Sequence, residues 1–316
     1  MSARPNERTV YLNGEFMPES RALVPYRDRG FYFGDGCFDI TRSFNHKLFF
    51  LEEHVARLYR SLKYLRIDPG LSPAEISRIT EEVFERNKPL LGPDEDYWVG
   101  QRITRGAIEV AGEAPERPGA TVVVECMPLP LKARAHMFRD GARAITPSIR
   151  RTPPEVLSPR VKTLNYLNLI VADQEVHARD PDAWAILLDM NGNLCEGLGS
   201  NILVVKDGVL MTPSERTVLP GVSRQKAMDF ARAAGVPVKE CDIDLYDAYA
   251  ADEAFITSTS LCVCPLAEIN GVRIGANAPD ASARGTPFGP ATRAIVDAYA
   301  AHVDCDFVAQ YLAHLD

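Results

Sequence analysis

The stretch that decides the fold is Asp189-Met190-Asn191-Gly192-Asn193-Leu194-Cys195-Glu196-Gly197-Leu198-Gly199-Ser200-Asn201-Ile202-Leu203-Val204-Val205. An apolar run precedes it, and Asn191-Gly192 is typical of the tip of a tight hairpin. The chain returns through Glu196, bends at two glycines and continues as a predicted strand at 202–205. The pattern places the Glu196 carboxylate at a strand end, beside backbone that can approach a ligand. An exposed glutamate next to an ordinary hairpin explains this stretch equally well.

The overall composition is that of an ordinary globular protein. The chain has 316 residues, of which 46% are hydrophobic and 25% charged, and this length suggests two domains. The net charge of −8 argues against nucleic acid or an anionic membrane as the main partner. No apolar run approaches the roughly 18 residues of a membrane span, and residues 1–7 lack the apolar core of a signal peptide. We therefore expect a soluble, cytoplasmic protein.

The seven cysteines are scattered, and only Cys262 and Cys264 lie close together. In an intracellular chain this spacing indicates buried thiols, and neither a disulfide framework nor a metal site is expected.

Hydrophobic periodicity predicts an α/β (α+β) organisation in two domains. In the first part it predicts a hairpin turning at Asn13-Gly14, a strand at 37–44, a helix at 52–66 and a second helix opening at the capping box Ser72-Pro73-Ala74-Glu75. Two prolines at 128–130 mark the boundary. We expect a small domain over 1–127, an interdomain loop at 128–138 and a larger domain over 139–316.

Several segments offer the chemistry of one cofactor. Lys162 lies in apolar sequence, where a lysine can form a Schiff base, although most such lysines lie at the surface. Residues 219–223 present backbone N–H groups at a predicted helix N-terminus, where anions bind. Arg57 suits a phosphate and Glu196 suits a protonated ring nitrogen. Together with the hydroxyls at 258–260, these groups describe a pyridoxal phosphate pocket.

At these residues the chain resembles the class IV, fold type IV, pyridoxal-phosphate aminotransferases. That family includes D-amino acid transaminases, (R)-amine transaminases, branched-chain aminotransferases and aminodeoxychorismate lyase. The similarity rests on six segments in family order: Phe33-Gly34-Asp35-Gly36, Glu53-His54-Val55-Ala56-Arg57-Leu58, Lys162-Thr163-Leu164-Asn165-Tyr166, Glu196-Gly197-Leu198-Gly199-Ser200-Asn201, Leu219-Pro220-Gly221-Val222-Ser223-Arg224 and Ala251-Asp252-Glu253-Ala254-Phe255-Ile256-Thr257-Ser258-Thr259. The resemblance implies fold type IV, with a small N-terminal and a larger C-terminal α/β domain joined by an interdomain loop, and a homodimer.

The resemblance also assigns roles. Lys162 matches the Schiff-base lysine, which is the catalytic residue, and Glu196 matches the partner of the pyridine nitrogen. Tyr166 falls where branched-chain enzymes place a tyrosine beside the cofactor's phenolic oxygen, whereas D-amino acid transaminases have leucine there. The remaining residues implied to bind pyridoxal 5′-phosphate are Arg57, Ser200, Asn201, Leu219, Val222, Ser223, Ser258 and Thr259.

The substrate motifs are mixed. Phe38-Asp39-Ile40-Thr41-Arg42 resembles the Phe-Glu-Gly-x-Arg of branched-chain enzymes, but Ile40 replaces glycine. Residues 101–106 are closer to D-amino acid transaminases, yet the Pro-Arg-x-His that follows there is absent. Arg42 either binds a substrate carboxylate or pairs with an acid of its own domain. Substrate contacts are expected at Phe33, Phe38, Ile40, Arg42 and Ser260.

The expected activity is transfer of an amino group from a D-amino acid or (R)-primary amine to a 2-keto acid, through a Schiff base on Lys162. The alternative is a branched-chain L-amino acid aminotransferase, and a further alternative is aminodeoxychorismate lyase. A pyridoxal phosphate carrier without enzymatic activity is the least expected function.

Overall fold

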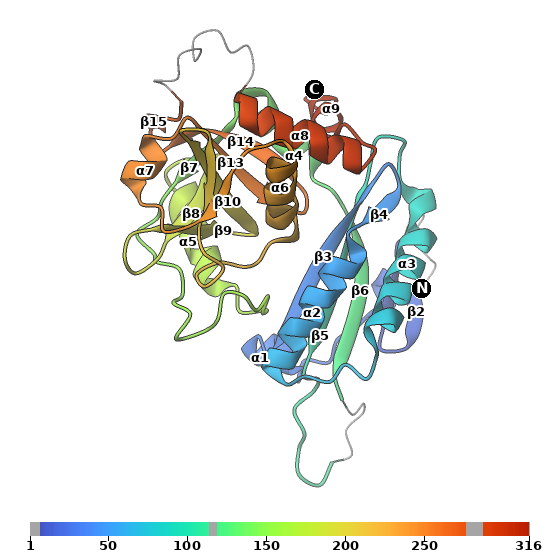
Figure 1. The fold of residues 1–316 in the computed structure, drawn as a ribbon. Helices are drawn as coiled ribbons and strands as arrows, with labels where there is room; N and C mark the ends of the chain where they lie inside the picture. The colour runs from blue at the N-terminus through green and yellow to red at the C-terminus, as the bar shows by residue number, and fades with distance from the viewer. Residues whose placement is uncertain (1–6, 114–118, 276–286, 316) are drawn as a thin grey trace. The chain divides into compact units, whose positions relative to one another are not determined.

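The computed structural model describes residues 7–113, 119–275 and 287–315, and the chain forms two compact units (Figure 1). The first comprises Met1–Leu129 with Val161–Asn165, and the second comprises Pro130–Arg160 with Tyr166–Asp316. The segment that carries Lys162 was expected in the second part of the chain. It packs with the first unit because its backbone pairs with a strand there: Leu164 N donates to Gly36 O at 3.0 Å, and Phe38 N donates to Lys162 O at 3.0 Å.

The first unit is built on a six-stranded antiparallel sheet in the order β2-β1-β6-β5-β3-β4. Its strands are β1 (Thr9–Leu12), β2 (Glu15–Pro18), β3 (Gly36–Phe44), β4 (Lys47–Phe49), β5 (Tyr97–Thr104) and β6 (Thr121–Pro128). The predicted hairpin at Asn13-Gly14 is present, and both residues have positive φ, at 49° and 104°. This matches the left-handed backbone that such a turn requires.

Two long helices form the core of the first unit together with this sheet. They are α2 (Leu51–Leu65) and α3 (Pro73–Asn87), and α3 opens with the predicted capping box between Ser72 and Glu75. Because successive side chains of a strand point to opposite faces, the residues of β3 alternate between the two faces of the sheet. Cys37 belongs to the core and Asp39 bonds to α2, so Phe38, Ile40 and Arg42 lie on the other face.

Short helical segments complete the first unit. They are η1 (Glu19–Arg21), α1 (Arg29–Phe33) and η2 (Lys88–Leu90). The carboxylate of Asp28 caps α1 by accepting from Gly30 N at 2.7 Å, and Gly34, with φ 66°, ends it.

The second unit contains a closed ring of strands. The ring order is β10-β13-β14-β7-β8-β9, and it closes because β9 also pairs with β10. The strands are β7 (Ala142–Ile145), β8 (Trp184–Leu188), β9 (Leu194–Gly197), β10 (Ser200–Lys206), β11 (Val209–Thr212), β12 (Val238–Glu240), β13 (Glu253–Ser258), β14 (Cys262–Ile269) and β15 (Val272–Arg273). Strands β11, β12 and β15 extend the sheet beyond the ring.

The helices of the second unit are α4 (Leu131–Asp140), α5 (Leu167–His177), α6 (Val222–Ala233), α7 (Leu245–Tyr249), α8 (Pro290–His302) and α9 (Phe307–Leu312). Helix α4 occupies most of the segment 128–138 that was expected to be a loop. Pro130 stands just before its first turn, where a missing N–H costs nothing, and Leu131, Ala135 and Phe138 are buried.

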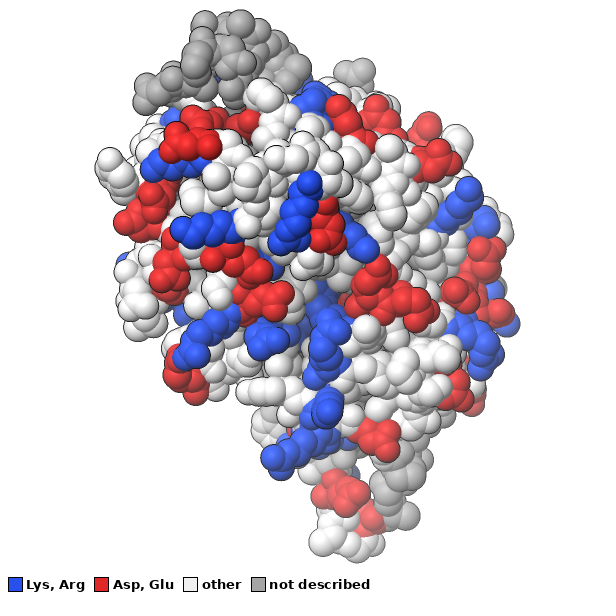
Figure 2. Space-filling view, viewed as in Figure 1, with Lys and Arg blue, Asp and Glu red and all other residues white. Residues whose placement is uncertain are grey.

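The cysteines are free thiols, and all except Cys241 are buried. Burial raises the pKa of Cys37, Cys126 and Cys195 to about 12, so these thiols stay protonated at neutral pH. Within the described residues no helix is long and apolar enough to cross a membrane. On the face shown in Figure 2, basic and acidic side chains are interspersed.

Candidate active site

Glu196 lies at the seam where the ring of the second unit closes. It sits on β9, opposite Asn201 of β10, and only 4% of the residue is exposed. Its Oε1 accepts from Arg151 Nε at 2.8 Å, and its Oε2 accepts from the backbone N of Leu219 at 2.9 Å. Glu196 is therefore a buried carboxylate whose two oxygens are both held, and the explanation as an exposed glutamate is wrong.

The loop that leads into α6 is tied to the same seam. Asn201 Nδ2 donates to Leu219 O at 3.0 Å. A Cβ added at Gly221 would lie 2.1 Å from Asn201 Oδ1, so a side chain at the N-cap of this helix would displace the Asn201 amide. No side chain caps the first turn of α6, where Val222 and Ser223 are buried. The first N–H groups of this helix thus have the arrangement that binds anions elsewhere.

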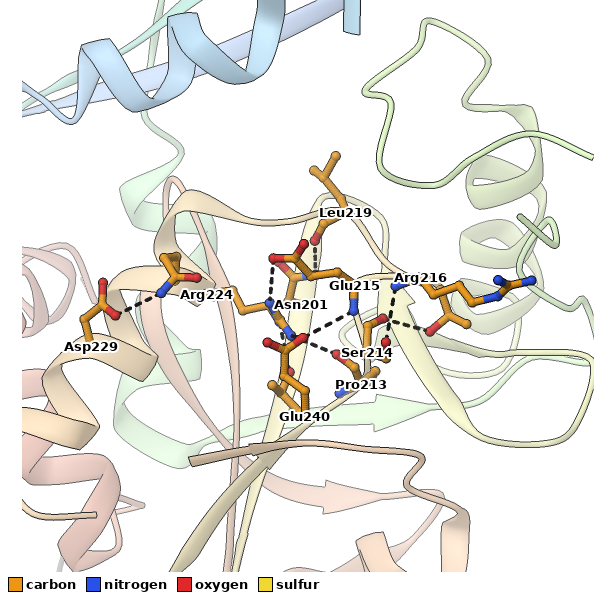
Figure 3. A network of polar contacts seen from close by, with 12 residues as sticks. Asn201, Pro213, Ser214, Glu215, Arg216, Leu219, Arg224, Asp229 and Glu240 are labelled. Atoms are coloured by element: carbon orange, nitrogen blue, oxygen red, sulfur yellow. Dashed lines mark hydrogen bonds and ion pairs between the residues drawn. The ribbon is translucent and has the colours of Figure 1, made fainter. Parts of the chain in front are cut away.

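Arg224, in the first turn of α6, bonds to residues of the neighbouring strands (Figure 3). It is 1% exposed. Its Nε donates to Thr212 Oγ1 at 3.1 Å, and its Nη2 donates to Pro213 O at 2.8 Å and to Glu240 Oε2 at 2.9 Å. A buried guanidinium held by several acceptors has little freedom to move. The start of α6 is therefore anchored to the end of β11 and to β12.

Lys162 belongs to the first unit. Its backbone N donates to Ser61 Oγ of α2 at 3.2 Å, and Thr163 forms an isolated bridge with Cys37 of β3. The residue is 9% exposed, and its Nζ lies 4.5 Å from the centroid of the Phe38 ring. The lysine is buried against an aromatic face, as a reactive amine requires, and does not project from the surface.

Arg57 of α2 is held by a buried acid of β3. Its Nε donates to Asp39 Oδ2 at 2.8 Å and its Nη2 donates to Asp39 Oδ1 at 2.7 Å. The same carboxylate lies 2.7 Å from His54 Nδ1. Burial by itself raises the pKa of Asp39, but the Arg57 charge and the His54 bond hold it well below its usual range. Burial also lowers the pKa of His54, so a neutral His54 donates from Nδ1 to an ionised Asp39.

Most other expected cofactor residues lie in the second unit. Ser200 accepts from Trp184 Nε1 at 2.8 Å. Ser223 Oγ lies 3.4 Å from Tyr299 Oη. Ser258 Oγ lies 3.3 Å from Ser260 Oγ and accepts from Leu261 N at 3.0 Å. These contacts hold the turn that contains the half-buried Thr259.

Two further expected residues have clear surroundings. Tyr166 stands at the N-cap of α5 and packs against a small cluster formed by Leu169, Ala172 and Leu187. Ser260 accepts from Arg134 Nη1 of α4.

The expected substrate residues lie in three different environments. Phe38 is buried and Ile40 half-buried on β3, whereas Phe33 at the end of α1 is 57% exposed. Arg42 is 2% exposed, with Nη2 3.7 Å from Asp96 Oδ2 and Cζ 3.9 Å from the Phe44 ring centroid. Arg42 thus pairs with an acid of its own domain, which is one of the two alternatives that the sequence left open.

Sequence reasoning missed Asp39, His54 and Arg151 as residues that hold others in place. Asp39 was visible as an acid between Phe38 and Ile40 on a predicted buried strand, and buried acids need a partner. Arg151 lies in a proline-rich loop distant in sequence from Glu196, so no local pattern could pair them.

Comparisons with known proteins identify the family of the chain. The sequence pattern of the family "Amino-transferase class IV" matches residues 36–269. The chain belongs to the class IV aminotransferases. Members of this family depend on pyridoxal 5′-phosphate, so this protein is a pyridoxal-phosphate aminotransferase.

Individual class IV aminotransferases differ in their named substrates. The chain is 38% identical over 263 residues to the "Putative branched-chain-amino-acid aminotransferase" of Methanocaldococcus jannaschii, covering 83% of this chain and 88% of that protein. It is 32% identical over 275 residues to the D-alanine aminotransferase of Bacillus licheniformis, covering 85% and 91%. The crystal structure of the branched-chain aminotransferase from Thermoproteus uzoniensis with norvaline matches with a TM-score of 0.81 at 28% identity, covering 98% of this chain and 97% of that chain.

The donors present in this aminotransferase fit the cofactor. Three kinds of group that pyridoxal phosphate needs are present: a buried carboxylate with both oxygens held at Glu196, a buried amine at Lys162, and the first turn of α6, which no side chain caps.

We predict that Asp39→Asn destabilises the protein by about 3 kcal/mol at pH 7, because it leaves the buried Arg57 charge uncompensated. The pKa of Asp39 is lower in the folded than in the unfolded protein. Its stabilising contribution is therefore complete above the unfolded pKa of about 3.9 and is lost as the pH falls below it. Urea unfolding should show the same difference from wild type at pH 7 and pH 5 and a smaller difference at pH 3.5. Asp242→Asn, at an exposed site, is the matched control, and a constant difference would contradict the prediction.

Proposed function

We propose that this aminotransferase moves an amino group from a D-amino acid or an (R)-primary amine to a 2-keto acid. The preference for a D-amino acid or (R)-amine donor rests on residues 38–42 of β3, which depart from the motif of branched-chain enzymes. Ile40 interrupts it, and Arg42 is buried against Asp96 and Phe44. The 32% identity to a D-alanine aminotransferase supports the same choice.

A second candidate is a branched-chain L-amino acid aminotransferase. The 38% identity to the Methanocaldococcus protein and the likeness to the Thermoproteus structure favour it. The two candidates share the cofactor and differ in the handedness of the amino donor.

In either case the bound cofactor withdraws electrons from the bond to the α-hydrogen of the substrate. We propose that Lys162 Nζ links the protein to the cofactor and, once displaced by the amino donor, removes the α-proton as a general base. Its Nζ lies 4.5 Å from the centroid of the Phe38 ring, and only 9% of the residue is exposed. The backbone bonds of residues 162–164 to β3 and α2 hold the base in place.

We propose that Glu196 keeps a proton on the ring nitrogen of the cofactor. Each carboxylate oxygen of Glu196 accepts one hydrogen bond, Oε1 from Arg151 and Oε2 from the backbone N–H of Leu219. A carboxylate oxygen can accept more than one hydrogen bond. The bonds that hold Glu196 orient it without consuming its capacity to accept a further donor.

The phosphate of the cofactor is assigned to Arg57, the backbone of Val222 and Ser223, and Thr259. Asp39 orients Arg57 through Nε and Nη2, and Arg224 anchors the first turn of α6. We propose that Tyr166 lies beside the phenolic oxygen of the cofactor, and that Ser200, Asn201, Leu219 and Ser258 complete its surroundings.

We predict that a D-amino acid or (R)-1-phenylethylamine, added singly to the purified holoenzyme, abolishes the visible absorbance of the bound cofactor, whereas L-leucine does not. Each donor is tested alone by absorbance scanning. No keto acid acceptor is needed, because transfer of the amino group from the donor to the cofactor already changes the absorbance. Loss of the band with L-leucine alone would make the protein a branched-chain enzyme. Release of pyruvate from aminodeoxychorismate without an acceptor would identify a lyase.

We predict that Lys162→Ala lowers turnover at least about a thousandfold, because both the link to the cofactor and the base are lost. Borohydride reduction of the wild-type holoenzyme followed by peptide mass mapping should place the cofactor on Lys162. The exposed Lys132→Ala on α4 is the matched control and should retain activity. A cofactor mapped to any other lysine refutes the assignment.

We also propose that the protein is a homodimer. Exposed aromatic side chains gather on α1, where Phe31, Tyr32 and Phe33 are 79%, 51% and 57% exposed. Apolar clusters of this kind mark interaction surfaces. Light scattering should give twice the 34.9 kDa of the chain, with Phe31→Ser shifting the equilibrium toward monomer. A wild-type monomer at micromolar concentration would contradict the proposal.

A further inference from the structure

The Phe38 ring carries two cations in the first unit. Lys162 Nζ lies 4.5 Å from its centroid, and Arg102 Cζ lies 5.4 Å from it. Phe38 of β3 and Arg102 of β5 are direct neighbours in the register of the two strands. A second positive charge therefore contacts the same aromatic ring as the lysine to which we assign the proton transfer.

The acidic neighbour of Arg102 is Glu125 of β6. Arg102 Nη2 lies 2.8 Å from Glu125 Oε1, and the two side chains are 32% and 24% exposed. Glu125 Oε1 is buried, yet the contact lacks the alignment of a hydrogen bond. The pair is thus a charge contact at the edge of solvent, not a forked guanidinium–carboxylate pair.

Other arginines of this part of the sheet are held more firmly. Arg42 is 2% exposed and donates from Nε to Ser43 O at 2.8 Å. Arg105 donates to Asp35 and to the carbonyls of Leu65 and Arg66, which close the end of α2. Of these three arginines, Arg102 combines partial exposure, a poorly aligned partner and a contact with the ring that Lys162 also contacts.

We propose that Arg102 binds the carboxylate of the amino acid and keto acid substrates. This inference rests on the proposed function of Lys162. A substrate carboxylate offers the guanidinium the forked geometry that Glu125 does not provide. Glu125 compensates the Arg102 charge when no carboxylate is bound, so an amine that lacks a carboxylate leaves the Arg102–Glu125 pair intact. One site would then accept both amino acids and amines that lack a carboxylate.

The test compares an amino acid with its amide, which has nearly the same shape and lacks the carboxylate charge. With the donor of the accepted hand, Arg102→Gln should lower kcat/KM for the amino acid by about 10- to 100-fold, chiefly through KM, and leave the amino acid amide within about twofold. Glu125→Gln should lower KM for the amino acid, because the competing carboxylate is gone. Arg60→Gln, an exposed arginine of α2, should change neither substrate.

A binding measurement separates this inference from the proposed function. Calorimetric titration of the holoenzyme with 4-methylvalerate and with its amide reports carboxylate binding without turnover, and Arg102→Gln should weaken only the acid. Arg102-dependent binding in a protein that converts no amino donor would refute the proposed function and leave the inference standing. Equal loss for acid and amide, unchanged binding in Arg102→Gln, or no binding of the acid by the wild type would each overturn the inference.

Discussion

The carboxylate of Glu196 joins three segments of the second unit: the short strand β9, the loop that carries Arg151 and the loop that carries Leu219. A buried carboxylate is costly unless its oxygens are bonded, so these segments have to come together for the ring to close. The pairing of β9 with both β8 and β10 places the residue at that seam. Asn201, its register partner, then bonds the Leu219 carbonyl. Ring closure and the start of α6 are thus stabilised by the same few contacts.

The first unit uses a buried acid in a different way. Asp39 receives two bonds from Arg57 and one from His54, so its charge serves to orient its neighbours. It does this from the face of β3 that packs on α2, whereas Phe38, which supports Lys162, points to the opposite face. Because side chains alternate between the two faces of β3, adjacent residues have different surroundings. Asp39 holds Arg57 and His54 on one face, and Phe38 contacts Lys162 on the other.

Features set by neighbouring residues could be predicted from the sequence. The hairpin at Asn13-Gly14 and the capping box at Ser72 each depend on a few consecutive side chains. The assignment of Lys162, Glu196 and Arg57 came from motif order, and the structure finds all three buried. Contacts between distant segments could not be predicted. Arg151 meets Glu196 and Arg42 meets Asp96 across long stretches of chain, and α4 was hidden by the prolines that precede it.

The path of the chain around Lys162 has a consequence for synthesis. The chain leaves the first unit at Leu129, returns for Val161–Asn165 and leaves again. Once residues 1–129 have emerged from the ribosome, every strand of the first sheet is outside it, but the segment that bonds to the start of β3 is not. Until residue 165 emerges, the nascent first unit holds Gly36 and Phe38 without their backbone partners. Lys162 is therefore added last to the unit that contains it, and a truncated product that ends before it has every strand of the first sheet but lacks this lysine.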